Sequence, residues 1–278
     1  MMFKRRTRGI KLRGARVLIT GAGSGIGRLM ALDAARRGAA EVIIWDLSEE
    51  SAEAVRAQVA ARGCAASTHI VNVADRDAVY SAAVDCGPID VLINCAGAVT
   101  GKYLMDTTDE AIIRTFQINT LALYWTTRAF LPTMVERDLG MIVNVASAAG
   151  IVGVAKQTDY SASKFAAFGF TESLRSELRA RGSHAGTLVV APYYIDTGMF
   201  EGVTTKLPHL LPILKEGDVA RQIVDAVESG REQLVMPPFA RLLPAVRLLP
   251  VPLFDKVMDA AGVNQTMDHF TGRGEEDA

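Results

Sequence analysis

Residues 16–27 read Arg16-Val17-Leu18-Ile19-Thr20-Gly21-Ala22-Gly23-Ser24-Gly25-Ile26-Gly27, an apolar run followed by a glycine-rich loop. The run is typical of a β-strand, and the loop leads into a helical pattern. Free backbone N–H groups at a helix start favour a pyrophosphate, and glycines let the backbone turn sharply and approach it closely. The loop fits G-x-G-x-x-G in no register, but it fits T-G-x-x-x-G-x-G. We therefore expect phosphates to bind at Gly21, Ser24, Gly25, Ile26 and Gly27.

Strand and helix patterns continue to alternate along the chain, which predicts βαβ units and a parallel sheet. Six further strands are expected at Glu41–Trp45, Ser67–Val73, Val91–Asn94, Gly140–Val145, Thr187–Ala191 and Gln233–Met236. The expected helices are Gly25–Arg37, Glu49–Arg62, Arg76–Cys86, Asp109–Arg137, Tyr160–Arg181 and Gly217–Glu228, with Asp109 as an N-cap and Gly38 and Gly182 as stops. Seven strands fit one α/β, doubly wound sheet with helices on both faces and a ligand crevice at the strands' carboxyl ends.

The composition favours a single domain. The chain has 278 residues, 49% of them hydrophobic, which is enough for one large α/β core. We divide it into a basic tail at residues 1–13, a core domain at residues 14–236 and an apolar, Pro-rich extension at residues 237–278. The net charge of -1 gives no general attraction to nucleic acid. Three cysteines without ligand spacing argue against a disulfide framework and a metal site, and they indicate a reducing, cytoplasmic compartment.

The amino-terminal segment is strongly basic. It carries Lys4, Arg5, Arg6, Arg8, Lys11, Arg13 and Arg16 without an acidic residue among them. One interpretation is a solvated tail, and the other is a patch that meets acidic lipid head groups. Because no long apolar stretch follows Met1, we expect neither a secretory signal peptide nor a membrane anchor there.

Two apolar segments break the strand–helix rhythm. Residues 199–216 follow a strand's carboxyl end and are irregular, which predicts a lid over the crevice. Pro237–Val257 is rich in Leu, Val and Phe, but prolines and arginines interrupt it, so it cannot form one bilayer-spanning helix. It either packs on the body or on a subunit neighbour, or it contacts a membrane surface.

Polar residues at the ends of three expected strands are candidates for binding adenosine. Asp46, next to Leu47, lies about 20 residues after the glycine loop, where a carboxylate can accept hydrogen bonds from ribose hydroxyls and repel a 2′-phosphate. Asp46 therefore favours NAD over NADP, although an ordinary turn carboxylate is the alternative. Asn72, next to Val73, is either an adenine ligand or a simple turn residue. The segment with Asn94, Ala96 and Gly97 offers a narrow backbone surface on the adenosine side.

Tyr160 and Lys164 are four residues apart, and Ser147 follows an expected strand upstream. Residues at i and i+4 share one helix face, so an ammonium group can favour ionisation of a nearby phenol beside a hydroxyl donor. This arrangement predicts proton transfer. A pair at this spacing is common by chance on amphipathic helices, and it gains meaning here from Ser147, Asn119 and the glycine loop.

These motifs, in this order, resemble those of the short-chain dehydrogenase/reductase family. The resemblance covers about Arg13 to Met236 and implies a Rossmann-like fold. A narrower likeness, in residues 192–200 and 262–270, is to the retinol and hydroxysteroid dehydrogenase branch, which acts on lipid-like alcohols. Cys95 stands where the family usually has a second asparagine, and Tyr193 stands where it usually has a glycine.

The resemblance implies roles for individual residues. Tyr160 becomes the general acid/base, Lys164 its electrostatic partner and ribose ligand, Ser147 the hydroxyl that orients substrate, and Asn119 the support of a proton-relay water. Pro192, Ile195 and Thr197 are expected at the nicotinamide. Substrate is expected to touch Ser147, Tyr160, Ala148, Val154, Tyr193, Met199 and Phe200.

These features predict an NAD-dependent oxidoreductase for a small hydrophobic alcohol or carbonyl compound of retinoid, steroid or fatty type. A carbonyl reductase that uses NADPH and a non-catalytic dinucleotide-binding scaffold are the alternatives. The two longest expected helices resemble the family's dimer-forming helices, so we expect a homodimer or homotetramer. Peripheral contact with a membrane stays open.

Overall fold

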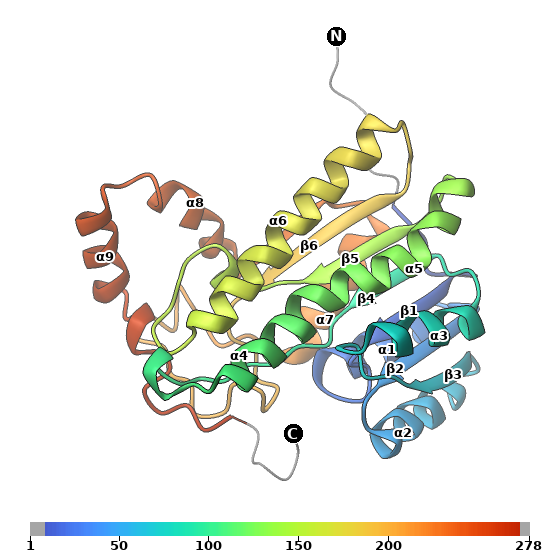
Figure 1. Cartoon of the computed structure of the whole chain (residues 1–278), viewed down its shortest axis with the longest axis horizontal. Helices are drawn as coiled ribbons and strands as arrows, with labels where there is room; N and C mark the ends of the chain where they lie inside the picture. Colours follow the sequence, from blue (N-terminus) through green and yellow to red (C-terminus); the bar gives the residue numbers. More distant parts are fainter. Residues whose placement is uncertain (1–8, 273–278) are drawn as a thin grey trace.

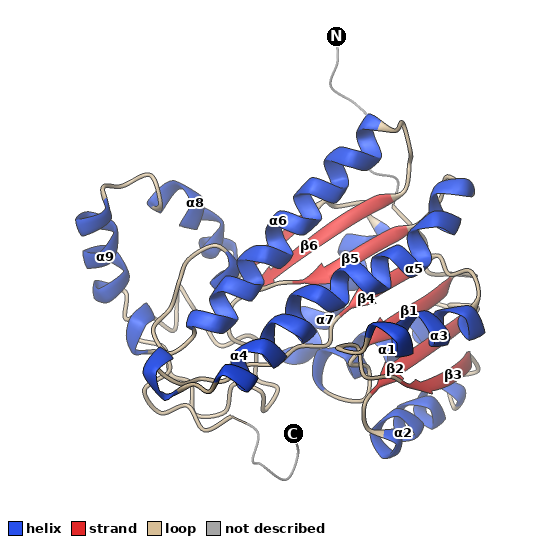
Figure 2. Cartoon of the chain, in the orientation of Figure 1, coloured by secondary structure: helices blue, strands red, loops and turns tan. Residues whose placement is uncertain are grey.

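The computed structural model describes residues 9–272 and contains one seven-stranded parallel sheet (Figures 1 and 2). Its order is β3-β2-β1-β4-β5-β6-β7. The strands are β1 (Arg16–Thr20), β2 (Glu41–Asp46), β3 (Ala65–Ile70), β4 (Val91–Asn94), β5 (Met141–Val145), β6 (Gly186–Pro192) and β7 (Gln233–Met236). The chain reverses its direction of winding between β1 and β4, where such sheets bind ligands. The predicted doubly wound, Rossmann-like single domain is confirmed.

Helices cover both faces of the sheet (Figure 1). The nine helices of the described residues are α1 (Gly25–Arg36), α2 (Glu49–Ala60), α3 (Arg76–Cys86), α4 (Asp109–Phe116), α5 (Ala122–Glu136), α6 (Thr158–Ala180), α7 (Glu216–Glu228), α8 (Leu243–Val246) and α9 (Val251–Ala260). On β1, Val17 and Ile19 pack with α1, α2 and α7, whereas Leu18 packs with α3, α5 and α6. This alternation follows from the two-residue period of a strand.

Most expected boundaries hold, and the exceptions have physical reasons. The third strand is Ala65–Ile70 rather than Ser67–Val73, because its pairing with β2 begins at Ala65 opposite Glu41. Thr108, not Asp109, is the N-cap of α4, since its side chain accepts a hydrogen bond from the Ala111 N–H. Gly38 and Gly182 follow α1 and α6 with φ of 83° and 71°, left-handed values that end a helix as predicted.

The helix expected at Asp109–Arg137 is not continuous. A π-helical turn, Gln117–Leu121, separates α4 from α5. Such turns insert one extra residue per turn and often occur at functional sites. This turn carries Asn119, whose side chain is turned into the protein and is 2% exposed.

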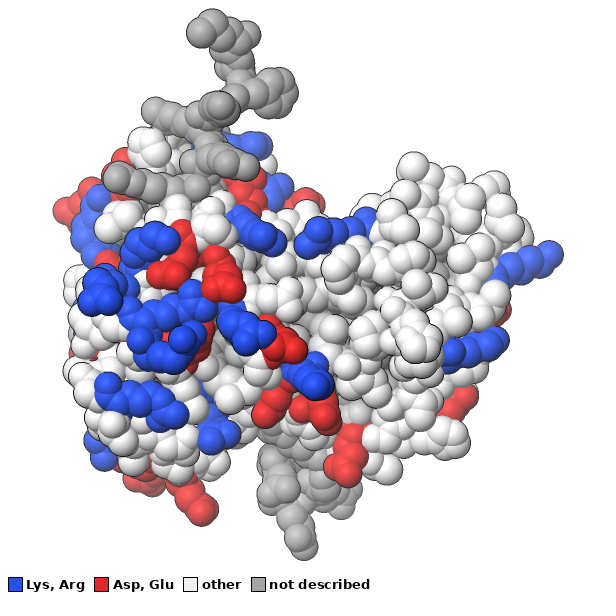
Figure 3. Space-filling model, turned by 180° about the vertical axis from the view of Figure 1, so that it is seen from behind, with Lys and Arg blue, Asp and Glu red and all other residues white. Residues whose placement is uncertain are grey.

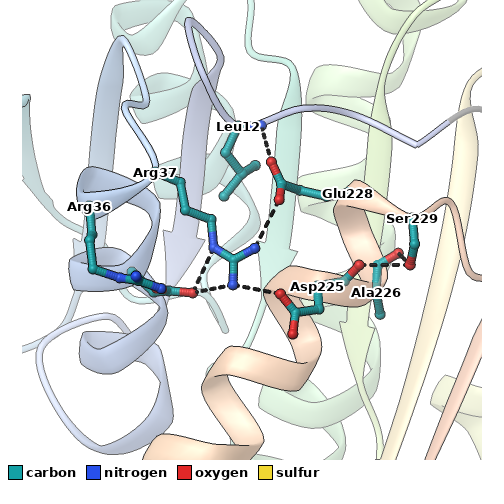
Figure 4. A network of polar contacts seen from close by, with 8 residues as sticks. Leu12, Arg36, Arg37, Asp225, Ala226, Glu228 and Ser229 are labelled. Atoms are coloured by element: carbon teal, nitrogen blue, oxygen red, sulfur yellow. Dashed lines mark hydrogen bonds and ion pairs between the residues drawn. The ribbon is translucent and has the colours of Figure 1, made fainter.

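An ion-pair network joins α1 to α7 on the face opposite α6 (Figure 4). The Arg37 guanidinium lies 2.9 Å from Asp33, 2.7 Å from Asp225 and 2.8 Å from Glu228. Glu228 also accepts a hydrogen bond of 3.1 Å from the Leu12 N–H. Burial opposes the charge of Arg37, but hydrogen bonds to the three carboxylates outweigh it and raise its pKa. The network therefore fixes the segment before β1 to both helices.

The Pro-rich extension forms α8, α9 and two 3₁₀ turns, η4 (Pro238–Leu242) and η5 (Val263–Gln265), at one end of the sheet (Figure 1). The hydrophobic cluster beneath them contains Val152, Leu211, Ala240, Met258 and Val263. Among residues 9–272, no helix combines the length and apolar character that crossing a membrane requires. The basic residues Lys4, Arg5, Arg6 and Arg8 lie outside the described residues, so their part in either interpretation of the tail stays a prediction. Arg16 belongs to β1 and forms an ion pair of 2.7 Å with Glu41.

Candidate active site

A cavity of about 160 Å³ lies at the carboxyl ends of the central strands. On the cofactor side, its walls include predicted residues Gly21, Ser24, Gly25, Ile26, Gly27, Ala96, Gly97, Pro192, Ile195 and Thr197. On the substrate side they include predicted residues Ser147, Ala148, Val154, Tyr160, Lys164, Tyr193, Met199 and Phe200. The fold thus gathers most of the predicted site into one space.

The glycine loop has a backbone that a phosphate group could approach closely. Gly21 and Gly25 have φ of 66° and 50°, which side chains rarely adopt. A Cβ atom on Gly27 would lie 2.1 Å from the Gly21 carbonyl oxygen, and one on Gly21 would lie 2.9 Å from the Ala96 Cα. The loop leads directly into α1, and Ser24, Gly25, Ile26 and Gly27 at the start of this helix line the cavity, where a pyrophosphate is favoured.

Tyr160 and Lys164 share the buried face of α6, as predicted. The Lys164 Nζ lies 5.5 Å from the centre of the Tyr160 ring and donates a hydrogen bond of 2.9 Å to the Val145 carbonyl oxygen. Ser147 accepts a hydrogen bond from the Ala149 N–H at 3.1 Å and donates one to the Pro192 carbonyl oxygen at 3.5 Å, and its hydroxyl is near enough to Tyr160 to lower the pKa of the phenol. The three groups on which proton transfer would depend are therefore adjacent.

In the chain by itself, the pKa values of Tyr160 and Lys164 differ from those that the sequence led us to expect. Burial raises the pKa of Tyr160 to about 12, and the hydrogen bond with Ser147 opposes that rise only in part. Burial likewise lowers the pKa of Lys164 to about 8. The predicted fall in the pKa of the phenol is absent, because burial dominates and the ammonium group is hydrogen-bonded to a carbonyl.

Asn119 lies behind the cavity rather than in its wall. Its Nδ2 donates to the Ala98 carbonyl at 2.8 Å and to the Ser163 Oγ at 3.0 Å, and its Oδ1 accepts from the Ala98 N–H at 2.9 Å. Ser163 in turn donates to the Tyr160 carbonyl at 2.7 Å. In this structure Asn119 joins the loop after β4 to α6, and its role with a relay water stays a prediction.

Of the residues predicted on the adenosine side, Ala96 and Gly97 line the cavity, whereas Asp46, Leu47, Asn72, Val73 and Asn94 lie outside its wall. The Asp46 Oδ2 accepts a hydrogen bond of 2.7 Å from the Gly23 N–H, and its Oδ1 accepts one of 3.1 Å from Ser48. Asp46 is therefore attached to the glycine loop, with exposed Leu47 beside it. Asn72 accepts a hydrogen bond from the Ala74 N–H, the geometry of the simple turn alternative, and Val73 is buried.

Asn94 is buried between strands. Its amide donates to Asn144 on β5 at 2.8 Å, and its carbonyl accepts from Thr126 on α5 at 2.8 Å. Both ends of the side chain are therefore used inside the protein, so only the Asn94 backbone remains for the narrow surface that the sequence predicts. Nearby, Thr20 accepts hydrogen bonds from the Cys95 and Ala96 N–H groups, which aligns this segment with β1.

A buried carboxylate adjoins Tyr160. Asp159, at the start of α6, is 4% exposed and accepts hydrogen bonds from Thr100 at 2.9 Å and from Thr115 at 2.8 Å. Thr100 follows the Asn94–Gly97 segment, and Thr115 lies on α4. Asp159 therefore joins three segments around the proton-transfer residue. No periodic pattern or motif points to Asp159, because its partners are distant in the chain.

Several cavity residues were missed at the sequence level. They are Cys95, Val145, Ala146, Ala149, Val152, Gln157, Tyr194, Leu211, Leu243, Met258 and Val263. Leu211 lies within the predicted lid and Val263 within the segment that carries the narrower resemblance, so these two had a signal. Leu243 and Met258 come from the extension and reach the cavity only through tertiary packing. Across residues 9–272, no group of His, Cys, Asp or Glu side chains is arranged to hold a metal ion.

The model of the family described as "short chain dehydrogenase" matches residues 15–208. The chain belongs to this family. This short-chain dehydrogenase is 40% identical to Bos taurus "Short-chain dehydrogenase/reductase family 16C member 6" over 262 residues, which cover 92% of the chain and 80% of the relative. It is also 40% identical to Mus musculus "Epidermal retinol dehydrogenase 2", over 92% of the chain and 85% of the relative. Both matches confirm the predicted family, branch and oxidoreductase class.

A solved structure has the same fold as this short-chain dehydrogenase. It is a short chain dehydrogenase/reductase from Burkholderia phymatum in complex with NAD, with a TM-score of 0.77 and 26% sequence identity. The match covers 86% of the present chain and 94% of the Burkholderia chain. The similarity thus spans nearly the whole dehydrogenase domain.

Proposed function

We propose that this short-chain dehydrogenase interconverts an apolar alcohol and its carbonyl compound with NAD as cofactor. The observation that carries the proposal is a cavity in which Tyr160, Ser147 and Lys164 meet apolar walls formed by Val152, Phe200 and other side chains. Hydroxyl and ammonium groups in an otherwise apolar pocket suit a substrate with one polar, reacting end.

The glycine loop and Asp46 favour NAD as the cofactor. The loop lines the cavity at the start of α1, where phosphates are favoured. The Asp46 carboxylate is attached to the loop through Gly23, where it would repel a 2′-phosphate. The Burkholderia structure, which is in complex with NAD, supports the same cofactor. When bound, NAD supplies the hydride acceptor.

The chain's own residues would move the proton. Tyr160 would take the hydroxyl proton of the alcohol while Ser147 donates a hydrogen bond to the developing carbonyl oxygen. Because burial raises the pKa of Tyr160 to about 12, the phenolate needs additional positive charge nearby. The Lys164 ammonium group lies on the same helix face, and the positively charged nicotinamide ring of bound NAD would add to its effect, while apolar walls exclude water from the transfer.

The substrate class is proposed from the walls and from the relatives. Val154, Tyr193 and Met199 surround the reacting groups with apolar surface, which fits a retinoid, a steroid or a fatty alcohol. The name "Epidermal retinol dehydrogenase 2" supports the inclusion of retinol among the compounds tested.

The test measures NADH formation across retinol, hydroxysteroids and fatty alcohols with purified protein. Tyr160→Phe should lower kcat by about a thousandfold, within the usual range for loss of a general acid/base. Tyr124→Phe, on the exposed side of α5, is the matched control and should leave kcat unchanged. Unchanged turnover in Tyr160→Phe would defeat the proposed role, and nucleotide binding without turnover of any alcohol would favour the scaffold alternative.

A second measurement separates NAD from NADP. Asp46→Ala should weaken NAD binding and reduce the discrimination against NADP, because the charge that repels a 2′-phosphate is removed. Asp77→Ala, an exposed carboxylate in the first turn of α3, is the control. Stronger turnover with NADPH than with NADH in the unchanged chain would instead favour the carbonyl reductase alternative.

We also propose a homodimer or homotetramer through the helices on the α6 side. Exposed Leu121 and Tyr124 near the start of α5 and Phe165 on α6 leave apolar surface there, which supports such a contact. Light scattering of the purified chain tests it, and a monomer at all concentrations would contradict it.

A further inference from the structure

The lobe formed by η4, α8 and α9 exposes an unusual amount of apolar surface. Six large apolar side chains are exposed in it: Phe239, Leu242, Leu248, Val251, Leu253 and Val257. Leu248 and Val251 are 85% and 70% exposed. Seen from behind, this end of the molecule is an uncharged field with Lys and Arg side chains at its sides and Asp and Glu side chains along its lower edge (Figure 3). Contiguous apolar surface of this kind marks an interaction site on a soluble domain.

The apolar face of α9 is covered along one margin and exposed along the other. The covered margin contributes Met258 to the cavity wall, and Phe254 packs against the hydrophobic cluster beneath the lobe. The outer margin presents Leu253 and Val257 to the exterior. Charged residues occupy the remaining face, so α9 is amphipathic, and an amphipathic helix normally buries its whole apolar face. The outer margin of α9 therefore lacks a covering partner within the described chain.

The charges of the lobe favour an anionic partner. Arg241 and Lys256 are exposed, and neither forms an ion pair with another residue in the range 9–272. The exposed Arg247 donates a hydrogen bond to the Ile151 carbonyl oxygen and lies over the Phe165 ring. Its charge therefore stays at the edge of the apolar surface. Asp255 and Asp259 are four residues apart and share a different edge of α9, where Asp259 accepts a hydrogen bond from Asn264.

We propose that residues 239–257 dock on the surface of an anionic lipid bilayer, with the apolar side chains among the acyl chains and the basic side chains at the head groups. Short amphipathic elements bind in this way, and each basic group near such a surface strengthens the attraction. Leu243 and Met258 from the same lobe line the cavity. The docked lobe would therefore bring the cavity next to lipid-dissolved alcohols, a consequence that rests on the proposed function.

Co-sedimentation of the full chain with vesicles tests the docking. Phosphatidylcholine vesicles with phosphatidylglycerol should bind the chain more strongly than vesicles without it, and added salt should weaken this preference. The double variant Leu248→Ser, Leu253→Ser should bind about tenfold more weakly or worse, since two apolar side chains no longer leave water. The double variant Val84→Ser, Met105→Ser changes exposed apolar residues elsewhere and should bind like the unchanged chain.

Charge is tested separately. Arg241→Glu with Lys256→Glu should remove the preference for phosphatidylglycerol, whereas Arg62→Glu, exposed at the end of α2, should not. Thermal unfolding checks that every variant is folded. Tyr160→Phe should bind vesicles normally although it is inactive, so failure of the catalytic proposal and failure of docking are distinguishable.

Three outcomes would overturn the proposal. The full chain would fail to sediment with anionic vesicles, or the two double serine variants would bind equally. Alternatively, sedimentation velocity would show self-association that Leu248→Ser, Leu253→Ser abolishes, which would assign the lobe to a contact between copies of this chain.

Discussion

The ring of Phe200 meets the ring of Tyr160 edge to face, with 5.7 Å between their centres. The ring centres of Tyr194 and Phe270 lie 5.1 and 6.4 Å from the ring centre of Phe200. A series of neighbouring aromatic rings therefore runs from Tyr160 to the C-terminal segment. The first residues of the predicted lid therefore lie directly against the proposed general acid/base. Whether this segment moves as a lid remains a prediction.

Phe200→Ala should raise KM for an apolar alcohol by about tenfold or more, because burial of such a side chain contributes about 1.5–3 kcal/mol. The effect on kcat should be smaller, since the proton-transfer groups stay in place. Steady-state kinetics with NAD and a fatty alcohol measure both constants. Met105→Ala, whose side chain is 94% exposed, is the control, and a lower kcat at unchanged KM would contradict the expectation.

Ser147→Ala should shift the pH dependence of alcohol oxidation to higher pH. The Ser147 hydrogen bond lowers the pKa of Tyr160 against the larger effect of burial, so its loss makes the phenolate harder to form. We expect a shift of about one pH unit, together with a lower rate at neutral pH. Ser176→Ala, at the exposed side of α6, should leave the pH profile unchanged, and an unshifted profile in Ser147→Ala would reject the hydrogen bond's role.

Lys164 should make stability rise with pH. Its pKa falls from 10.5 to about 8 on folding, so between these values the unfolded chain binds more protons than the folded chain. The free energy of unfolding should therefore increase across this window by about 3 kcal/mol at most. Burial raises the pKa of Cys86 to about 11 and the pKa of Cys95 to about 12, so these thiols act in the opposite direction above pH 9, and the raised pKa of Tyr160 does so above pH 10. The rise is therefore expected between pH 8 and pH 9. Urea titrations at several pH values should show the rise, which Lys164→Met should lose and Lys256→Met should keep.

Arg37→Met should lower the free energy of unfolding by about 2–3 kcal/mol, because Asp33 and Glu228 would lose their partner in a partly buried site. The Arg37 side chain is only 16% exposed. Arg36→Met is the matched control, since Arg36 binds the same Asp33 but is 66% exposed. Its removal should cost less than about 1 kcal/mol. Equal losses in urea unfolding would show that the network across α1 and α7 adds nothing.

Asp159→Ala should reduce both stability and turnover. Loss of the carboxylate leaves the Thr100 and Thr115 hydroxyls without their buried acceptor, at about 1–3 kcal/mol. Because Asp159 adjoins Tyr160, we expect kcat to fall by about tenfold while KM for NAD changes little. Asp159→Asn retains one acceptor oxygen and should recover part of both losses. Asp106→Ala, exposed in the turn before α4, provides the control.

The sheet could be predicted closely because parallel, buried strands appear as short apolar runs between helical patterns. β1, β4 and β7 have the predicted bounds, whereas β3 starts two residues and ends three residues earlier than predicted. The residues of β3 are half-buried or exposed at the sheet edge, so its apolar signal is weak and its pairing with β2 determines its start. The π-helical turn at Asn119 has no sequence period of its own and was missed for that reason.

The candidate site was predictable where a motif is local. Residue spacing alone was enough to predict the glycine loop and the Tyr160–Lys164 pair, and the fold places both in one cavity. The pKa of Tyr160 was not predictable, because it depends on burial and on the direction in which the Lys164 ammonium points. The contribution of Leu243 and Met258 also escaped prediction, since the path of the Pro-rich extension is set by tertiary packing.

The hydrogen bond between the Asp46 carboxylate and the Gly23 N–H joins the glycine loop to the end of β2 before any nucleotide arrives. A loop of four glycines within seven residues would otherwise sample many backbone conformations. Here its conformational entropy is lost on folding, not on binding. Such preorganisation lets a dinucleotide bind without having to order the loop itself.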